Sequence, residues 1–526
     1  MKRFFLLSLM CFGCASEPKV VRVYGNHIVE GAYVPPEAYA AYLRGALAEE
    51  AGDLKGAVGA YERALDEDDE DPEIWTRAGA VRCKLDPKDT KADDAFAKAL
   101  KLDRTYAGTF AARATCLTAR GKTDEAAAAA LEAAKADPTN VDVAALVVRT
   151  SKATPGARER AIALTVAAGE RAAAWEALVH WGRAHGDAEL TARGLEGLAR
   201  LSPTRSAEIE TGALELLGQG FTVYARRVAA AVADVPQDNG GGGPRDATVA
   251  RLAIDDAILA GDRARIERRA VRGHVALAEV AARAMLLDAR ETALRVARDE
   301  IAADPKNAGA QMVVAAASTT KARELTPATD AVSEACALVF ADALAAGTNA
   351  DSAKTWLARI QRLPSAAHDP VIGPLAVDLA ARGVLSADEL PIETRIELAA
   401  RRREAPPAIA SLPPGSVDAK HLFLWHALTN PASKESQTLA TQLSAAVDRD
   451  PLVGFALARV VLSKARDEAR WNDIRRAIAA APAHPLLLAI AVELAKAMGK
   501  PDELPPAKAR LMAVARTPAE RALATE

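Results

Sequence analysis

The chain is 526 residues long, and although half of its residues are hydrophobic, only 4% are aromatic. An interior built mainly from Ala, Leu and Val favours closely spaced helices. The net charge of −3 is too small to indicate a nucleic-acid partner. The five cysteines are too few for a disulfide framework in a chain of this length.

The N-terminus has the pattern of an export signal. Residues 1–3 are Met-Lys-Arg, residues 4–12 form a short apolar run, and Gly13 stands directly before Cys14. The run is too short to remain as a membrane-spanning helix, and no later stretch is long and apolar enough to cross a bilayer. We therefore expect residues 1–13 to be a signal peptide.

A small residue directly before a cysteine resembles the signal of bacterial lipoproteins. The resemblance implies that the sulfur of Cys14 receives a lipid and that Cys14 becomes the first residue of the mature chain. Cys11 and Phe12 depart from the Leu and the small residue that this family prefers. Ala15 and Ser16 replace the Asp that retains such lipoproteins at the inner membrane, so the resemblance points to the outer membrane, facing the periplasm. The alternative is an ordinary secretory signal with incidental cysteines.

Strands are expected only in the segment that follows the signal. Residues 20–24 are rich in strand formers, Gly25 and Asn26 can turn, and residues 27–34 can pair back. Because a free hairpin is only marginally stable, an extended tether over residues 14–35 is the alternative.

Residues 38–138 contain the same unit three times, at a spacing of 34 to 35 residues. Small residues recur at equivalent places, namely Gly45, Gly79 and Ala114, then Ala57, Ala92 and Ala126, then Ala64, Ala99 and Ala133. Bulky residues recur between them, with Trp75 matching Phe110 and Tyr61 matching Phe96. A fixed period of this size indicates a stacked array of helix pairs rather than a closed globule.

The first unit shows the physical basis of the pattern. Residues 39–52 are helix formers that end at Gly52, and residues 54–65 form a second helix. Helices joined by so short a turn lie antiparallel, and their backbones approach closely only where side chains are small. The expected close-contact positions are Gly45, Ala57 and Ala64, and the side chains expected to fill the space around them are Leu47, Tyr61 and Leu65.

These residues resemble the tetratricopeptide repeat, whose pattern is a large residue, Gly or Ala four later, then Ala, an aromatic, Ala and a closing Pro. The third copy fits best and has, in the family's order, Phe110, Ala114, Gly121, Ala126, Ala133 and Pro138. The second copy carries an extra residue within 87–90, and the first carries an acidic insertion before Pro72. The resemblance implies an all-α fold, an α-solenoid of antiparallel helix pairs coiled into a right-handed superhelix, with its best repeats at residues 38–72, 72–106 and 107–138.

Helix pairs are expected to continue to residue 236, because residues 175–203 repeat the spacing of residues 110–138. Residues 237–245 include four consecutive glycines, whose backbone entropy predicts a flexible linker. A phosphate-binding glycine loop is the alternative, but no Lys-Ser or Lys-Thr pair follows. The sequence therefore predicts a tetratricopeptide repeat domain over residues 36–236 and a domain of degenerate helical repeats over residues 246–526.

In the tetratricopeptide family, the first helices of successive repeats line a concave groove that binds an extended peptide or a partner helix. Carried over residue by residue, the groove positions with larger side chains are Tyr39, Tyr42, Glu49, Glu50, Glu73, Thr76, Lys84, Thr115 and Thr118. Those with small side chains are Ala46, Ala80, Cys83, Gly108, Ala111 and Ala119. The Lys and Asn set that clamps a C-terminal carboxylate in chaperone-binding members is absent. Two tyrosines and three glutamates at one end suit a neutral or basic partner segment, although these positions can also pack on a neighbouring repeat or face solvent.

Two other features of the repeat region have competing interpretations. The acidic run within residues 66–73 could hold Ca²⁺ or a basic partner, but it lacks the alternation and the glycine of a calcium loop, so a solvated connector is favoured. Cys83 and Cys116 lie near the ends of adjacent first helices and could reach each other in an oxidising compartment. Because a cysteine without a partner is usually buried and inert, we favour two small apolar side chains instead.

Basic and aromatic clusters in the remainder of the chain give no clear site. One helical face that could meet lipid head groups or an anionic glycan carries Arg265, Arg268, Arg269 and Arg272, although an exposed helix face is the simpler interpretation. Two groups of imidazole and indole rings are His180, Trp181 and His185, and His421, Trp425 and His426. Neither group places two imidazoles and a carboxylate on one side of a helix, so we expect aromatic packing and neither a metal nor another cofactor.

The sequence predicts a protein that binds partners without catalysis. Residues 483–526 contain no Trp, Tyr or Phe for an aromatic-lined sugar cleft, and no serine nucleophile elbow is present. We expect a protein–protein interaction scaffold or adaptor anchored in the bacterial cell envelope, with protein partners in the groove and a membrane contact through the lipid. The alternatives are an assembly factor for an outer-membrane or secretion complex, and a regulatory subunit of a peptidoglycan-active enzyme.

Overall fold

The computed structural model describes residues 20–24, 27–31, 35–236, 243–317, 321–322, 325, 332–347, 350–359, 369–464, 475–497, 499 and 501–525. The expected signal peptide, Cys14 and most of the glycine run lie outside these residues. The chain divides into two compact units, an N-terminal unit of residues 1–164 and a C-terminal unit of residues 165–526. Each unit is described by itself.

A short hairpin precedes the helices. Strand β1 (Val20–Tyr24) pairs antiparallel with β2 (His27–Gly31), so that Val20 lies opposite Gly31 and Tyr24 lies opposite His27. The hairpin expected from the strand formers is therefore present, and its second strand ends at Gly31.

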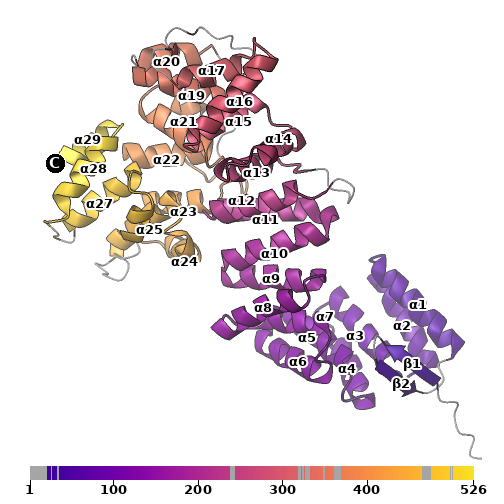
Figure 1. The fold of residues 1–526 in the computed structure, drawn as a ribbon. Coiled ribbons are helices and arrows are strands. Elements are labelled where there is room, and N and C mark those ends of the chain that lie inside the picture. The colour runs from indigo at the N-terminus through magenta and orange to yellow at the C-terminus, as the bar shows by residue number, and fades with distance from the viewer. Residues whose placement is uncertain are drawn as a thin grey trace, which may run out of the picture. The chain divides into compact units, whose positions relative to one another are not determined.

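The N-terminal unit is an array of antiparallel helix pairs (Figure 1). Its helices are α1 (Pro36–Glu50), α2 (Leu54–Glu67), α3 (Pro72–Leu85), α4 (Thr90–Leu102), α5 (Ala107–Ala119), α6 (Thr123–Ala136), α7 (Val141–Thr150) and α8 (Pro155–Ala167), the last of which crosses the boundary between the units. Helices α1 and α2, α3 and α4, and α5 and α6 pack as pairs, while α3 packs on α2 and also on α5. The predicted all-helical repeat architecture is confirmed.

Small residues bring the paired helices together at the positions that the repeat predicts. A Cβ atom placed on Gly45 would lie 2.7 Å from the Tyr61 ring, and one on Gly79 would lie 2.9 Å from the Phe96 ring. Each glycine therefore accommodates the aromatic side chain of the second helix in its own pair. The turn after α1 uses Gly52 at a φ of 79°, a left-handed conformation that favours glycine.

The acidic run before α3 forms a connector and a helix cap. Asp71 accepts a hydrogen bond from the backbone N–H of Glu73 at 2.8 Å, and Asp68 accepts one from the backbone N–H of Glu70 at 3.2 Å. The Trp75 indole donates to the backbone carbonyl of Asp69 at 2.8 Å. Among the described residues, no group of His, Cys, Asp and Glu side chains could hold a metal ion.

The C-terminal unit continues with helices in the same alternating manner (Figure 1). Its first helices are α9 (Ala172–His185), α10 (Ala188–Leu201), α11 (Ser206–Gly218), α12 (Thr222–Ala233), α13 (Ala247–Leu259), α14 (Arg263–Arg272), α15 (Leu277–Leu286), α16 (Arg290–Ala303) and α17 (Ala308–Ala316). They are followed by α19 (Glu334–Gly347), α20 (Ala350–Leu357), α21 (Ile372–Ala381), α22 (Ile392–Arg402), α23 (Ala419–Thr429), α24 (Lys434–Gln442), α25 (Pro451–Lys464), α27 (Pro485–Ala497), α28 (Leu504–Val514) and α29 (Pro518–Thr525). Three short 3₁₀ turns cover Pro203–Arg205, Ala387–Glu389 and Ser444–Ala446.

The helices on either side of the glycine run pack against each other within the C-terminal unit. Helix α12 contacts α13 directly, and one carboxylate oxygen of Glu210 accepts hydrogen bonds from the backbone N–H groups of Arg245 and Asp246 at 3.0 and 2.8 Å. Arg269 on α14 donates to Asp234 at 2.8 Å. The helices on either side of residues 237–242 therefore belong to one body.

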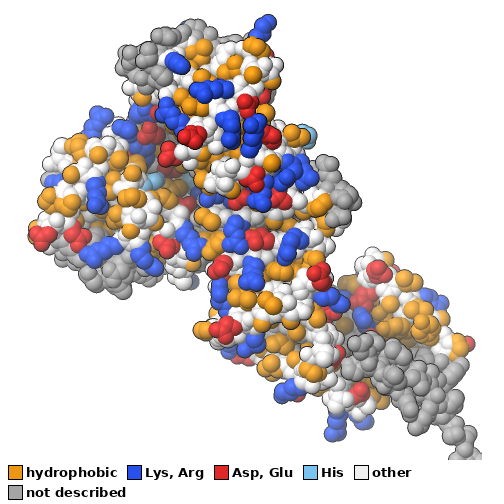
Figure 2. Space-filling view, in the orientation of Figure 1, with side chains coloured by type: hydrophobic (Ala, Val, Ile, Leu, Met, Phe, Trp, Pro, Cys, Tyr) orange, Lys and Arg blue, Asp and Glu red, His pale blue; other side chains and the backbone are white. Residues whose placement is uncertain are grey.

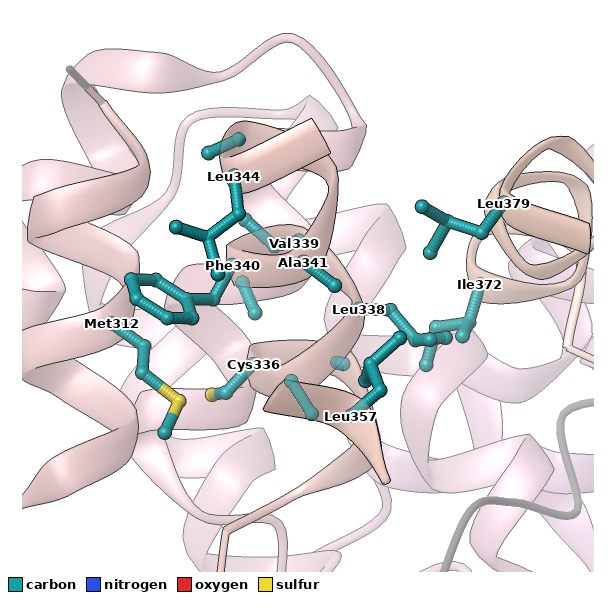
Figure 3. Packing of buried hydrophobic residues seen from close by; sticks show 14 of the residues in the cluster. Met312, Cys336, Leu338, Val339, Phe340, Ala341, Leu344, Leu357, Ile372 and Leu379 are labelled. Carbon is teal, nitrogen blue, oxygen red and sulfur yellow. The ribbon is translucent and has the colours of Figure 1, made fainter. Parts of the chain in front are cut away.

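The core of the C-terminal unit surrounds α19 (Figure 3). Met312 and Phe340 lie on one side of α19, and Leu338 points from the other side toward Ile372 and Leu379. The Phe340 ring meets that of Trp356 edge-on at a centroid distance of 4.9 Å. This unit also closes on itself at its far end, because Arg401 on α22 donates to Glu520 on α29 at 2.8 Å.

Candidate functional site

The predicted groove residues of the first two repeats form a connected polar cluster on the first helices. The Tyr42 hydroxyl on α1 donates to one carboxylate oxygen of Glu73 on α3 at 3.0 Å, and the Tyr106 hydroxyl, just before α5, donates to the other. Arg77 donates to Glu73 at 2.9 Å from one turn further along α3. Burial, and then the Glu73 carboxylate, raise the pKa of Tyr42 to about 12, so its hydroxyl remains a donor at neutral pH.

Glu49 is the second centre of this cluster. It accepts hydrogen bonds from the Tyr61 hydroxyl at 3.2 Å and from the Lys84 ammonium at 2.5 Å, and the Arg77 guanidinium lies 3.9 Å away. Two glutamates therefore join α1, α2, α3 and the start of α5. We call the residues Tyr42, Glu49, Tyr61, Glu73, Arg77, Lys84 and Tyr106 the groove cluster.

The remaining predicted groove residues differ in their exposure. Tyr39 is 57% exposed, and Glu50, Thr115 and Thr118 are also exposed. Thr76 is only 4% exposed, because its hydroxyl lies 2.6 Å from that of Thr109 in the next repeat. Thr76 therefore links two repeats and is removed from the set of residues that could contact a partner.

Helix α1 carries an apolar stripe that sequence reasoning missed. Leu47, which was expected to pack inside the first pair, is 64% exposed, and Leu43 is 41% exposed. The equivalent of Leu47 in the second repeat is Val81, which is fully buried in a cluster with Tyr61 of the preceding pair. Among the described residues no helix pair precedes α1, so this face lacks the cover that α3 receives. Because Leu47 belongs to the first repeat of the array, its exposure could have been expected from the sequence.

Cys83 on α3 and Cys116 on α5 form a disulfide, with their Cα atoms 5.8 Å apart. The interpretation of these residues as unpaired apolar side chains was therefore wrong. In the repeat alignment Cys83 is equivalent to Thr118, two residues beyond Cys116, but the packing of α3 on α5 brings Cys83 and Cys116 within bonding distance. Both cysteines are at most 4% exposed and pack in a cluster with Ala92 and Phe96.

The arginines on α14 are held by contacts within the chain. Arg268 and Arg269 donate to Asp234, Arg272 donates to the backbone carbonyls of Ala233 and Val235, and Arg265 pairs with Asp262 at 3.2 Å. The face seen in Figure 2 carries basic and acidic side chains intermixed, rather than an extended area of one sign. These observations favour a structural role for the arginines over a lipid or glycan site.

Two of the four histidines expected to pack on aromatic rings, His185 and His426, do so. The Trp181 and His185 rings lie 4.7 Å apart, and the Trp425 and His426 rings lie 5.1 Å apart. His421 instead bonds through Nδ1 to Asp418 at 2.8 Å.

No helix in the described part of the chain combines the length and apolar character that a membrane span requires.

Comparisons with known proteins identify similar folds but no relative. No protein-family model matches the chain, and no curated protein matches it. The chain is similar to the solved structure of Pseudomonas aeruginosa PilF at 18% identity, covering 45% of this chain and 90% of that chain, with a TM-score of 0.27. It is also similar to a chain of the APC/C complex Cut9–Hcn1 at 12% identity, covering 94% and 96%, with a TM-score of 0.29, and to the P58(IPK) TPR domain at 12% identity, covering 88% and 98%, with a TM-score of 0.18.

With TM-scores this low, the whole chains do not superpose, so the architecture is assigned from the helices of this chain. The period, the paired helices and the glycine–aromatic contacts at Gly45 and Gly79 agree with one another. The helix pairs of residues 36–136 are tetratricopeptide-like repeats.

Proposed function

We propose that this chain is a non-catalytic protein-binding scaffold held at the bacterial cell envelope, and that its partner binds along α1, α3 and α5 of the N-terminal unit. The observation that carries the proposal is the groove cluster. Its side chains are fixed by hydrogen bonds across three repeats, so a partner meets a surface that is already ordered, and little conformational entropy is lost on binding.

The exposed residues around the groove cluster define the chemistry of the partner. Tyr39, Leu43 and Leu47 offer an apolar stripe on α1, and Glu37 and Glu50 stand exposed at the two ends of the same helix. An amphipathic helix with an apolar face and basic ends matches both features.

Two features support a location in the envelope. The Cys83–Cys116 disulfide is typical of oxidising compartments, and the N-terminal sequence resembles a lipoprotein signal with Cys14 as the lipidated residue. A lipid at Cys14 would raise the local concentration of the scaffold at the outer membrane, where its partners would be held. Within this proposal the scaffold serves either the assembly of an outer-membrane or secretion complex or the regulation of a peptidoglycan-active enzyme.

Site-specific photo-cross-linking tests the partner surface in the full chain. A photoreactive phenylalanine replaces Tyr39 in one variant and Thr115 in another, and the control replaces Leu131, which is 52% exposed on α6. We expect the same partner to be cross-linked from positions 39 and 115 and to be absent from position 131. Equal cross-linking from all three positions would remove the groove from the proposal.

Lipid labelling tests the anchor separately. Radioactive fatty acid should enter the wild-type chain and should not enter the Cys14→Ser variant. Equal incorporation would contradict lipidation at Cys14, while the cross-linking result would stand.

A further inference from the structure

A cavity of about 240 Å³ lies inside the C-terminal unit, where α21, α22, α23, α25 and α27 converge on the start of α12. Ionisable side chains line it from four of these elements. They include Glu397 on α22, Lys420 and His421 on α23, Asp450 at the start of α25, and His484 at the start of α27. None of these residues belongs to the groove cluster, so the proposed function above does not use them.

Most charges around the cavity are already paired. Asp450 accepts from the Lys420 ammonium at 3.2 Å and caps α25 through the backbone N–H of Leu452 at 2.9 Å. Asp418 accepts from His421 Nδ1 at 2.8 Å and also caps α23. Because aspartates cap these helices, the positive ends of the helix dipoles are neutralised and do not favour an anionic ligand.

The third capping carboxylate adds negative charge. Asp369 caps α21 through the backbone N–H of Val371 at 2.9 Å, and its other oxygen accepts from Arg283. Arg283 is shared with Asp255, which it meets at 2.6 Å. Two carboxylates therefore share one guanidinium on this side of the cavity.

Two groups that line the cavity have no partner. Glu397 is 8% exposed and accepts no hydrogen bond from any described residue. His484 Nδ1 is shielded from solvent and is also unpaired. Burial lowers the pKa of His484 to about 4, so its ring is neutral at pH 7. Burial raises the pKa of Glu397 and so disfavours its charged form in the empty cavity. A cationic ligand that supplies N–H groups would stabilise the charged carboxylate there.

We propose that this cavity binds a primary alkylammonium group, with Glu397 as its carboxylate acceptor and His484 Nδ1 as a further acceptor. Pro370, Pro374 and Leu452 line the same cavity and provide apolar surface for the alkyl part. The ammonium would satisfy the one lining carboxylate that no basic side chain contacts within hydrogen-bond distance.

Calorimetric titration of the full chain tests the proposal with n-butylammonium as the probe. We expect saturable binding at one site, and binding of the neutral analogue n-butanol should be weaker by about tenfold or more, since a hydrogen bond to a charged group is worth at least that factor. Butyrate should not bind. A titration with Nα-acetyl-lysine amide distinguishes two sources of the ammonium group. If the ligand is the lysine side chain of a peptide, both n-butylammonium and Nα-acetyl-lysine amide should bind. If the ligand is a free amine, only n-butylammonium should bind.

The variant Glu397→Gln should weaken n-butylammonium binding by about tenfold or more while leaving the chain folded. Glu404→Gln is the matched control, because Glu404 is exposed just beyond α22 and does not line the cavity. A second variant, Thr222→Tyr, narrows the cavity from α12 without changing any charge and should also reduce binding. The proposal fails if n-butylammonium shows no saturable binding, if n-butanol or butyrate binds equally well, or if Glu397→Gln binds like Glu404→Gln.

Discussion

The helix pairs of the N-terminal unit and the interior of the C-terminal unit are held together by different chemistry. Between residues 36 and 136, the buried polar side chains of the described chain are threonines, and most of the buried hydrophobic residues are alanines, packed around larger side chains such as Tyr61 and Phe96. In the C-terminal unit, the buried side chains include Asp255, Arg283 and Glu397. The core of the helix pairs in the N-terminal unit therefore depends on the shape and volume of its side chains. The core of the C-terminal unit also depends on charge pairing.

This difference decides how each region responds to substitution. A core of small side chains fails when volume is added, because its helices have no space between them. A core with buried ion pairs fails when one partner is removed, because the remaining charge stays buried without compensation. The predictions below use this contrast, from the largest expected effect to the smallest.

Removal of Arg283 is expected to have the largest effect. Arg283 and Asp255 are both fully buried, with their side chains 2.6 Å apart. Arg283→Met leaves Asp255 and Asp369 without their guanidinium and should lower the free energy of unfolding of the C-terminal unit by about 3–5 kcal/mol. Differential scanning calorimetry measures the loss.

The control for this substitution is Arg263→Met, since Arg263 pairs with Glu267 at 2.7 Å on an exposed helix face. Exposed ion pairs contribute little to stability. If both variants melt like the wild-type chain, charge pairing does not hold the C-terminal unit together.

Loss of the disulfide should have the next largest effect, and in the other unit. The bond joins Cys83 and Cys116 across a sequence separation of 33 residues, for which chain entropy predicts a stabilisation of about 4 kcal/mol. Dithiothreitol should lower the melting temperature of the N-terminal unit in the wild-type chain. It should have no effect on a double variant, Cys83→Ser with Cys116→Ser, which should melt at the lower temperature in either condition. If dithiothreitol leaves the melting temperature of the wild-type chain unchanged, the disulfide does not stabilise this unit.

The sequence predicts the local parts of this fold well. Residues 54–65 were expected as a helix and α2 spans Leu54–Glu67, while the pairing of Gly45 with Tyr61 follows from the repeat itself. These features depend on residues close together in the chain, where periodicity and turn signals act.

Contacts between distant residues could not be predicted in this way. Arg401 and Glu520 are 119 positions apart, and no local pattern indicates that α22 and α29 meet. The cavity at Glu397 depends on five such helices and left no signal in any one of them. Leu47 was misplaced for a related reason, since its exposure depends on whether another helix precedes α1.

Two glycine substitutions compare crowded with open positions in the N-terminal unit. A Cβ atom on Gly79 would lie 2.9 Å from the Phe96 ring and 3.1 Å from the backbone oxygen of Ala92, so Gly79→Ala should lower stability by about 1–3 kcal/mol. Gly59 in α2 has no atom within 4 Å of the same position, so Gly59→Ala should raise stability by about 0.5–1 kcal/mol through its better helix propensity. Urea denaturation measures both, and effects of the same sign would contradict the close approach of α3 and α4.

The last prediction is a pH dependence of the C-terminal unit, which is small over any one pH unit. Burial, and then the Asp369 carboxylate, raise the pKa of Glu334 to about 8, from 4.5 for an ordinary Glu. The folded state therefore holds a proton that the unfolded state releases, and stability should fall as pH rises from 4.5 to 8, by up to about 1.4 kcal/mol per pH unit. Glu334→Gln keeps the shape of the side chain but cannot ionise, so its melting temperature should depend less on pH across this range. If calorimetry between pH 6 and 8 gives parallel curves for the two chains, Glu334 is already ionised in the folded state, and its neighbours Arg251 and Arg283 compensate its charge more fully than its burial implies.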